Sequence, residues 1–192
     1  MEKLNVEHAK LHIALLGRPR ERSHLVAKNY HADKVLNAWL KESEVIPWVR
    51  AKNIKGYACW ISLNDKDFGN DTIEGVKALC VFWLDVDSNR EDKTVVATNL
   101  QLKEALERAQ KLKATIENQY ASIGFLAYSG NGFHIHFPLP RFELPSASFR
   151  REVNKKMRGF AKNIASKANV EIDHTYDIRR VTTLIGSWNL KI

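Results

Sequence analysis

The chain has 192 residues, of which 44% are hydrophobic, and its formal net charge is +8. This length suits one compact domain with a substantial core, and no apolar run approaches the roughly 18 residues that a membrane-spanning helix needs. The N-terminus lacks a secretory hydrophobic region, so a cytoplasmic protein without a membrane partner is expected. The positive charge favours a polyanionic partner, with a merely basic surface as the alternative.

The first third of the chain is predicted to contain two helices and one strand. Residues 4–16 have helical spacing, with Gly17 as the C-terminal stop. Residues 33–43 are predicted to form a second, short helix whose apolar side chains face inward. Residues 57–63 predict a strand, and a polar loop follows it.

The rest of the chain alternates strands with two long helices. The run 78–84 is apolar, β-branched and aromatic, which is typical of a buried strand, and Trp60 and Trp83 are expected in the core. The remaining predicted elements are a helix over 99–120, strands over 123–128 and 133–137, a helix over about 146–167 and a short strand over 170–172. Helices interleaved with strands predict an α/β or α+β fold.

Two aspartates, Asp85 and Asp87, end the apolar strand. Side chains alternate along a strand, so both carboxylates are expected on one face. Two such carboxylates repel each other unless a cation lies between them or one is protonated, and a hard divalent ion such as Mg²⁺ or Mn²⁺ is the usual solution. The alternative is a strand-end turn with solvated carboxylates.

A glycine-rich turn joins the two following strands. Gly130 and Gly132 flank Asn131, which favours close approach of the backbone, and exposed N–H groups in such a turn can hold phosphate oxygens. Ser129 adds a hydroxyl, and His134 leaves the turn on the strand, where it could donate to a triphosphate. The alternative is an ordinary Asn-Gly hairpin with a structural histidine.

The last part of the chain holds a third acid and several cations. Asp173 follows a short apolar segment, as Asp85 does, and is a candidate third carboxylate. Arg179, Arg180 and Lys191 are candidates for balancing phosphate charge, with surface salt bridges as the alternative. The predicted helix over 146–167 carries a basic stripe that suits contacts to a nucleic-acid backbone, or else a solvated face: Arg151, Lys155, Arg158 and Lys162.

The order of these motifs resembles the archaeo-eukaryotic primase superfamily. Its members carry an Asp-x-Asp pair, a Ser-x-His motif in a glycine-rich turn and a hydrophobic-Asp motif. In this chain Asp85-Val-Asp87, the glycine-rich turn from Ser129 to His134 and Ile172-Asp173 follow in the same order. The tail over 177–191 is similar to that of primase-polymerases from plasmids, viruses and CRISPR-associated systems. The resemblance covers about residues 56–192. Thr183 departs from it, because many relatives have an arginine there.

The resemblance implies a single primase-polymerase domain over 1–192. An N-terminal α/β part would reach to about residue 75, and an RRM-like mixed sheet flanked by helices would form the catalytic part from about residue 76. No zinc module is expected, since His134 and Asp173 have no cysteine between them. A helicase or other C-terminal replication region is expected to be missing from this chain.

The implied activity is DNA-templated nucleotidyl transfer, as a DNA primase, a DNA polymerase or both. Its partners would be a single-stranded DNA template, a primer and NTPs or dNTPs. The resemblance assigns two divalent ions, Mg²⁺ or Mn²⁺, to Asp85, Asp87 and Asp173. It assigns nucleotide binding to the following residues: Ser129, Gly130, Gly132, His134, Arg180 and Lys191.

Two other functions fit parts of the sequence. His134 and His136 form a histidine-hydrophobic-histidine pattern that is similar to the metal site of HUH rolling-circle initiators, which nick DNA through a tyrosine; Tyr176 would be that nucleophile. That alternative leaves the Asp pair unexplained. The chain could also be a non-catalytic DNA-binding replication module.

Overall fold

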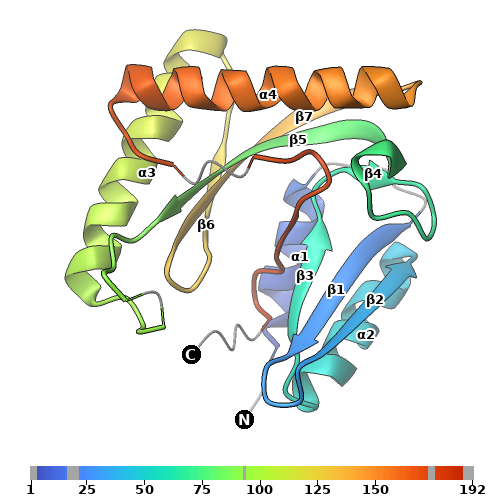
Figure 1. The fold of residues 1–192 in the computed structure, drawn as a ribbon. Coiled ribbons are helices and arrows are strands. Elements are labelled where there is room, and N and C mark those ends of the chain that lie inside the picture. Colours follow the sequence, from blue (N-terminus) through green and yellow to red (C-terminus); the bar gives the residue numbers. More distant parts are fainter. Residues whose placement is uncertain (1–3, 17–21, 93, 173–175, 188–192) are drawn as a thin grey trace.

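Two four-stranded sheets, both antiparallel in their pairings, organise the computed structural model, which describes residues 4–16, 22–92, 94–172 and 176–187 (Figure 1). The strand order is β2-β1-β3-β8 in the first sheet and β4-β5-β7-β6 in the second. The strands are β1 (Ser23–Asn29), β2 (Lys34–Leu40), β3 (Ala58–Ser62), β4 (Asp65–Lys66), β5 (Val76–Asp87), β6 (Phe125–Tyr128), β7 (Gly132–Glu143) and β8 (Val181–Thr183). The helices are α1 (Val6–Leu15), α2 (Glu42–Ile54), α3 (Asn99–Tyr120) and α4 (Ala147–Ala168), with a 3-10 turn η1 (Ile73–Gly75).

The helix predicted over residues 33–43 is wrong, because this segment is strand β2. It pairs antiparallel with β1 along its whole length, after a turn in which Asp33 adopts a φ of 44°. Leu36, Trp39 and Leu40 have the spacing of a helical face, but a short apolar run also fits a strand. The backbone hydrogen bonds to β1 decide between the two, and helix α2 begins only after the strand has ended.

Strand β8 brings the end of the described chain back to the first sheet, where it pairs with β3. The strand predicted over 170–172 is wrong: Asn169 ends α4 in the left-handed region, and Val170 and Ile172 then fill the core without strand pairing. Beyond β8, the N–H of Leu184 donates to the carbonyl of Cys59. The first sheet therefore contains strands from both ends of the sequence.

The second sheet follows the order β5-α3-β6-β7-α4, and both helices cover one face of it (Figure 1). The predicted α+β class is confirmed. A capping box of Thr98 and Gln101 begins α3, and the hydroxyl of Ser146 caps α4. Phe82 contacts Phe160 of α4 at a ring-centroid distance of 5.1 Å. Because side chains alternate along β5, the odd-numbered residues that end this strand face away from the helices.

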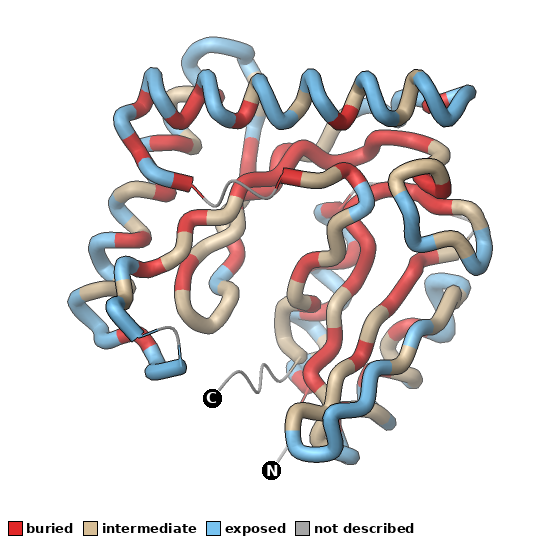
Figure 2. The backbone as a smooth tube through the Cα atoms, in the orientation of Figure 1, coloured by how far each residue is buried: buried red, intermediate tan, exposed pale blue. Residues whose placement is uncertain are grey.

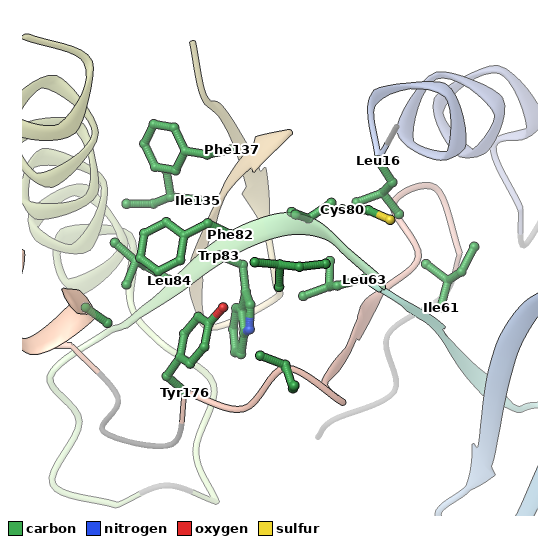
Figure 3. Packing of buried hydrophobic residues seen from close by; sticks show 14 of the residues in the cluster. Leu16, Ile61, Leu63, Cys80, Phe82, Trp83, Leu84, Ile135, Phe137 and Tyr176 are labelled. Carbon is green, nitrogen blue, oxygen red and sulfur yellow. The ribbon is translucent and has the colours of Figure 1, made fainter. Parts of the chain in front are cut away.

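One hydrophobic core extends over both sheets. Figure 3 shows Leu16, Ile61 and Leu63, which lie in or beside α1 and β3, in the same cluster as Phe82 and Trp83 of β5 in the second sheet. Buried residues follow β3 and β5, whereas the outward faces of α3 and α4 are exposed (Figure 2). The shared core fixes the two sheets relative to each other. Among the described helices, none combines the length and apolar character that crossing a bilayer requires.

Candidate active site

A cleft of about 680 Å³ lies between residues of the two sheets. It brings together five of the predicted site residues, which are far apart in the sequence: Asp85, Asp87, Ser129, His134 and Arg180. The sheet containing β5 and β7 supplies the acids and the glycine-rich turn. The other wall comes from the sheet containing β1, β3 and β8.

Asp85 and Asp87 occupy the same face at the end of β5, as alternation predicts. Asp85 pairs in register with His134 on β7, and Asp87 pairs with Gly132. The Oδ1 atom of Asp85 is buried and has no hydrogen-bond partner among the described residues; the His134 Nε2 atom lies 3.6 Å away. A buried carboxylate oxygen without a donor is unfavourable, and a cation would compensate it.

This donor set fits a divalent metal as far as the described residues extend. Asp87 is more open, with 44% of its side chain exposed, and its Oδ2 atom lies 3.7 Å from Arg90. Carboxylate oxygens are the ligands that Mg²⁺ and Mn²⁺ prefer. Within the described ranges no three His, Cys, Asp or Glu side chains gather as a metal site. Asp173, the predicted third acid, and Lys191 both lie outside the described residues.

The glycine-rich turn also fixes the loop beside the acids. The Asn131 side-chain oxygen accepts the N–H of Ala97 at 3.0 Å, and the Asn131 carbonyl accepts the N–H of Ser88 at 3.0 Å. Gly130 adopts a φ of 104°, which an L side chain rarely tolerates. Gly132 is buried against β5, and a Cβ atom there would lie 2.8 Å from the Cα of Asp87. The turn is therefore built around the Asp pair.

His134 and Arg180 stand on opposite walls of the cleft. The Nδ1 atom of His134 lies 2.8 Å from the hydroxyl of Thr182 in β8, so this side chain bridges the two sheets. The guanidinium of Arg180 lies over the ring of Trp83, 5.6 Å from its centre. The contact with Thr182 and the contact with Trp83 thus hold the imidazole of His134 and the guanidinium of Arg180 at the cleft.

The first sheet adds residues that sequence reasoning missed. Lys28, Tyr30 and Trp60 line the cleft; Lys28 lies over the ring of Tyr30 at 5.0 Å, and Tyr30 meets Trp60 edge-on at 6.5 Å. Trp60 was expected in the core, but it is only partly buried and faces the cleft. Alternation along β1 would have placed Lys28 on this face, had that segment been recognised as a strand.

Comparisons with known proteins agree with this architecture. No family model matches the chain, and no curated protein does. A crystal structure of primase RepB' superposes with a TM-score of 0.55 at 15% identity, covering 97% of this chain and 51% of that one. The chain has a primase fold. A second crystal structure, of the catalytic domain of primase RepB' in complex with initiator DNA, gives a TM-score of 0.54 at 15% identity, with 97% and 78% covered.

The primase fold confirms, at the level of architecture, the resemblance inferred from the motifs. The chain spans about half the length of the longer RepB' chain. The roles of individual residues stay predictions.

The basic stripe of α4 lies apart from the cleft. All four of its residues are exposed, and none lines the cleft, because α4 covers the opposite face of the second sheet (Figure 1). Arg151 pairs with Glu74 at 2.8 Å, and Arg158 donates to the carbonyl of Tyr176 at 3.2 Å. Lys155 and Lys162 extend from the same helix, so a DNA contact here would be additional to the cleft.

The nicking alternative finds no support in the geometry of the primase fold. His136 has 0% of its surface exposed, and its ring packs 4.9 Å from Phe125 and 5.5 Å from His12. The hydroxyl of Tyr176 is likewise buried and has no hydrogen-bond partner in the part of the chain that the structure describes, and burial raises its pKa. A metal shared by both histidines, or an attacking tyrosine, would require these groups to reach substrate.

His136 should make the stability of the protein depend on pH. Burial, with His12 and His134 nearby, lowers its pKa well below 6.5, so the folded state keeps the ring neutral while the unfolded chain protonates below about pH 6.5. The unfolded state then binds more protons, and stability falls as the pH drops below 6.5, by up to about 1.4 kcal/mol per pH unit. Urea unfolding between pH 7.5 and 5.5 measures this slope.

The matched variant is His136→Phe. Neither ring nitrogen of His136 has a hydrogen-bond partner among the residues that the structure describes, so a phenyl ring should leave stability at pH 7.5 unchanged or higher and reduce the slope. His24, whose pKa burial and Lys66 also lower, should account for a remaining slope of the same sign. An undiminished slope in His136→Phe would show that the proton uptake occurs elsewhere.

Proposed function

We propose that this chain is the catalytic domain of a DNA-templated nucleotidyltransferase of the primase class. The observation that carries the proposal is the cleft, in which Asp85 and Asp87 face Ser129, His134 and Arg180 within a primase fold. An acidic pair opposite a set of phosphate-binding groups is the arrangement that nucleotidyl transfer needs.

Asp85 and Asp87 would hold two divalent ions, Mg²⁺ or Mn²⁺, with Asp173 as the proposed third ligand. When bound, such ions would help the 3′-hydroxyl of the primer to lose its proton and attack. They would also neutralise charge on the α-phosphate and on the departing pyrophosphate. The partly open side chain of Asp87 leaves room for substrate oxygens, while the enclosed Oδ1 atom of Asp85 is suited to a permanent ligand. The orphan oxygen thereby gains a partner.

The incoming triphosphate would lie against the turn and the facing wall. His134 presents its Nε2 atom to the cleft, Ser129 offers a hydroxyl, and Arg180 supplies a charge that Trp83 holds in place. Backbone N–H groups around Gly130 would add donors. Lys191 is proposed as a further contact.

A single-stranded DNA template with its primer is the proposed macromolecular partner. The neighbour RepB' catalytic domain was crystallised in complex with initiator DNA. In this chain, the net charge of +8 favours a polyanion, and the aromatic rings of Tyr30 and Trp60 offer stacking surfaces for bases. Lys28 beside them suits a backbone phosphate.

A synthesis assay tests the proposal directly. Primed and unprimed single-stranded DNA would be incubated with labelled NTPs or dNTPs and Mg²⁺ or Mn²⁺. Products from the wild type, absent in the double variant Asp85→Ala/Asp87→Ala, would support nucleotidyl transfer, and products on unprimed template would support priming. Intact DNA binding without any product would favour a non-catalytic binding module.

The α4 stripe gives a separate prediction about DNA. Lys155→Ala with Lys162→Ala should weaken binding to single-stranded DNA and lower the slope of log affinity against log salt by about 0.7 for each phosphate that the protein no longer neutralises. Fluorescence anisotropy over a salt series measures the slope. Lys111→Ala on the exposed side of α3 is the control. Equal slopes in all three proteins would mean that α4 is only a solvated face.

A further inference from the structure

We propose that Thr182 is a positioning residue for His134: its hydroxyl fixes the imidazole in the tautomer that carries its proton on Nε2, facing the cleft. The inference rests on the proposed function, in which His134 donates to a triphosphate. A neutral imidazole has one N–H and one acceptor nitrogen, so the group bonded to Nδ1 decides which nitrogen can donate.

The hydroxyl of Thr182 is placed to act as the donor in this pair. Thr182 is 1% exposed, and its Oγ1 atom lies 2.8 Å from the Nδ1 atom of His134. No second partner for this hydroxyl occurs among the described residues. A buried O–H that did not point at Nδ1 would be left unsatisfied, which is costly. The threonine therefore donates, and Nδ1 accepts.

The other face of the ring points to the same tautomer. The Nε2 atom of His134 lies 3.6 Å from the Oδ1 atom of Asp85, and this oxygen accepts no hydrogen bond within the described ranges. An N–H directed at a carboxylate is favourable, whereas a nitrogen lone pair in that position would repel it. A proton on Nε2 also gives the cleft a donor for phosphate oxygens.

Strand β8 holds Thr182 rigidly enough for this task. Thr182 pairs in register with Ile61 of β3. Just after β8, the N–H of Leu184 donates to the carbonyl of Cys59, which also ties this segment to β3. A β-branched side chain has restricted rotation about χ1, so its Oγ1 atom keeps one position and the hydroxyl proton can turn toward the nitrogen beside it. The tautomer of a residue on the second sheet is thus set by a strand of the first sheet.

Two substitutions separate the hydroxyl from the shape of the side chain. Thr182→Val keeps the branched shape and removes the O–H, whereas Thr182→Ser keeps the O–H in a smaller side chain. Thr115→Val is the matched control, because the Thr115 hydroxyl donates to the backbone carbonyl of Lys111 within α3, away from the cleft. Thermal unfolding of all variants checks that the fold is retained.

The first readout is the tautomer itself, measured by ¹⁵N NMR of the histidine side chains, with His134→Gln to assign the signal. The wild type and Thr182→Ser should show a protonated Nε2 and an accepting Nδ1, and Thr182→Val should show a mixture. This measurement needs no enzymatic activity, so it tests Thr182 even if the proposed function fails. A wild-type His134 with its proton on Nδ1 would overturn the inference. This outcome needs only the wild-type protein, so the test holds even if Thr182→Val does not fold.

The second readout is the KM for the nucleotide compared with kcat. By analogy with the outer-shell partners of metal-ligating histidines, whose loss costs about 10- to 100-fold, Thr182→Val should raise the KM by about tenfold, with a smaller change in kcat. Thr182→Ser should recover most of the loss, and Thr115→Val should match the wild type. A serine variant as impaired as the valine variant, or a valine variant with unchanged KM and tautomer, would contradict the inference.

Discussion

Replacing Asp85 with asparagine is expected to reduce nucleotidyl transfer by on the order of 10³-fold, which corresponds to about 4 kcal/mol in the activation barrier. The amide keeps the size of the carboxylate and removes its charge, so metal binding should fail while DNA affinity changes little. Stability in metal-free buffer should change little, because no described residue donates a hydrogen bond to the buried Oδ1 atom of Asp85 and the His134 Nε2 atom lies 3.6 Å away. Steady-state synthesis rates, DNA anisotropy and thermal unfolding measure the three quantities.

A second comparison isolates the metal. Mg²⁺ or Mn²⁺ with a nucleoside triphosphate should raise the melting temperature of the wild type and leave that of Asp85→Asn unchanged. Glu152→Gln is the control for removing one negative charge, since Glu152 is exposed on α4 and forms a local ion pair with Lys156. Synthesis by Asp85→Asn within tenfold of the wild type would rule out Asp85 as a metal ligand.

Replacing Gly132 with alanine should damage both stability and activity. The new Cβ atom would overlap the carbonyl oxygen of Val86 and lie 2.8 Å from the Cα of Asp87, both of them backbone atoms of the facing strand. Strand β5 would have to move, at a cost of about 1–3 kcal/mol. The shift falls on Asp87, and a displacement near 1 Å at a reacting centre can cost about 10²-fold in rate.

Gly159 offers the matched substitution. It is exposed in the middle of α4, and apart from its chain neighbours and the backbone of its own helix no described atom lies within 4 Å of the place that the new methyl group would occupy. Gly159→Ala should therefore stabilise the protein by about 0.5–1 kcal/mol through helix propensity. Urea unfolding should shift in opposite directions for the two variants. Equal urea midpoints for Gly132→Ala and the wild type would mean that β5 and β7 can move apart enough to accommodate the methyl group without loss of stability.

Elements with long, regular patterns could be predicted from the sequence. The helix over 99–120 has the expected bounds, because its apolar face repeats over many turns and a capping box begins it. The strand that carries Asp85 was recognisable from its continuous apolar run. The cleft residues on this strand and the following turn could be placed because alternation and a short hairpin constrain them locally.

Elements that depend on distant pairing could not be predicted in this way. Residues 33–43 have the spacing of a helical face, and only pairing with β1 makes them a strand. Strand β7 continues to Glu143 through Pro138 and Pro140, which normally end a strand; Pro138 lies where the register with β5 shifts. The role of Thr182 needed the fold, since 48 positions separate it from His134.

The late position of β8 has a consequence for biosynthesis. The sheet that starts at Ser23 is finished by residues 181–183, which the ribosome adds near the end of the described chain. Until then the β3 edge has no partner, and a chain stopped after α4 would expose it to other chains. The same late residues place the hydroxyl beside His134. A nascent chain that has not yet reached these residues therefore could not assemble the cleft.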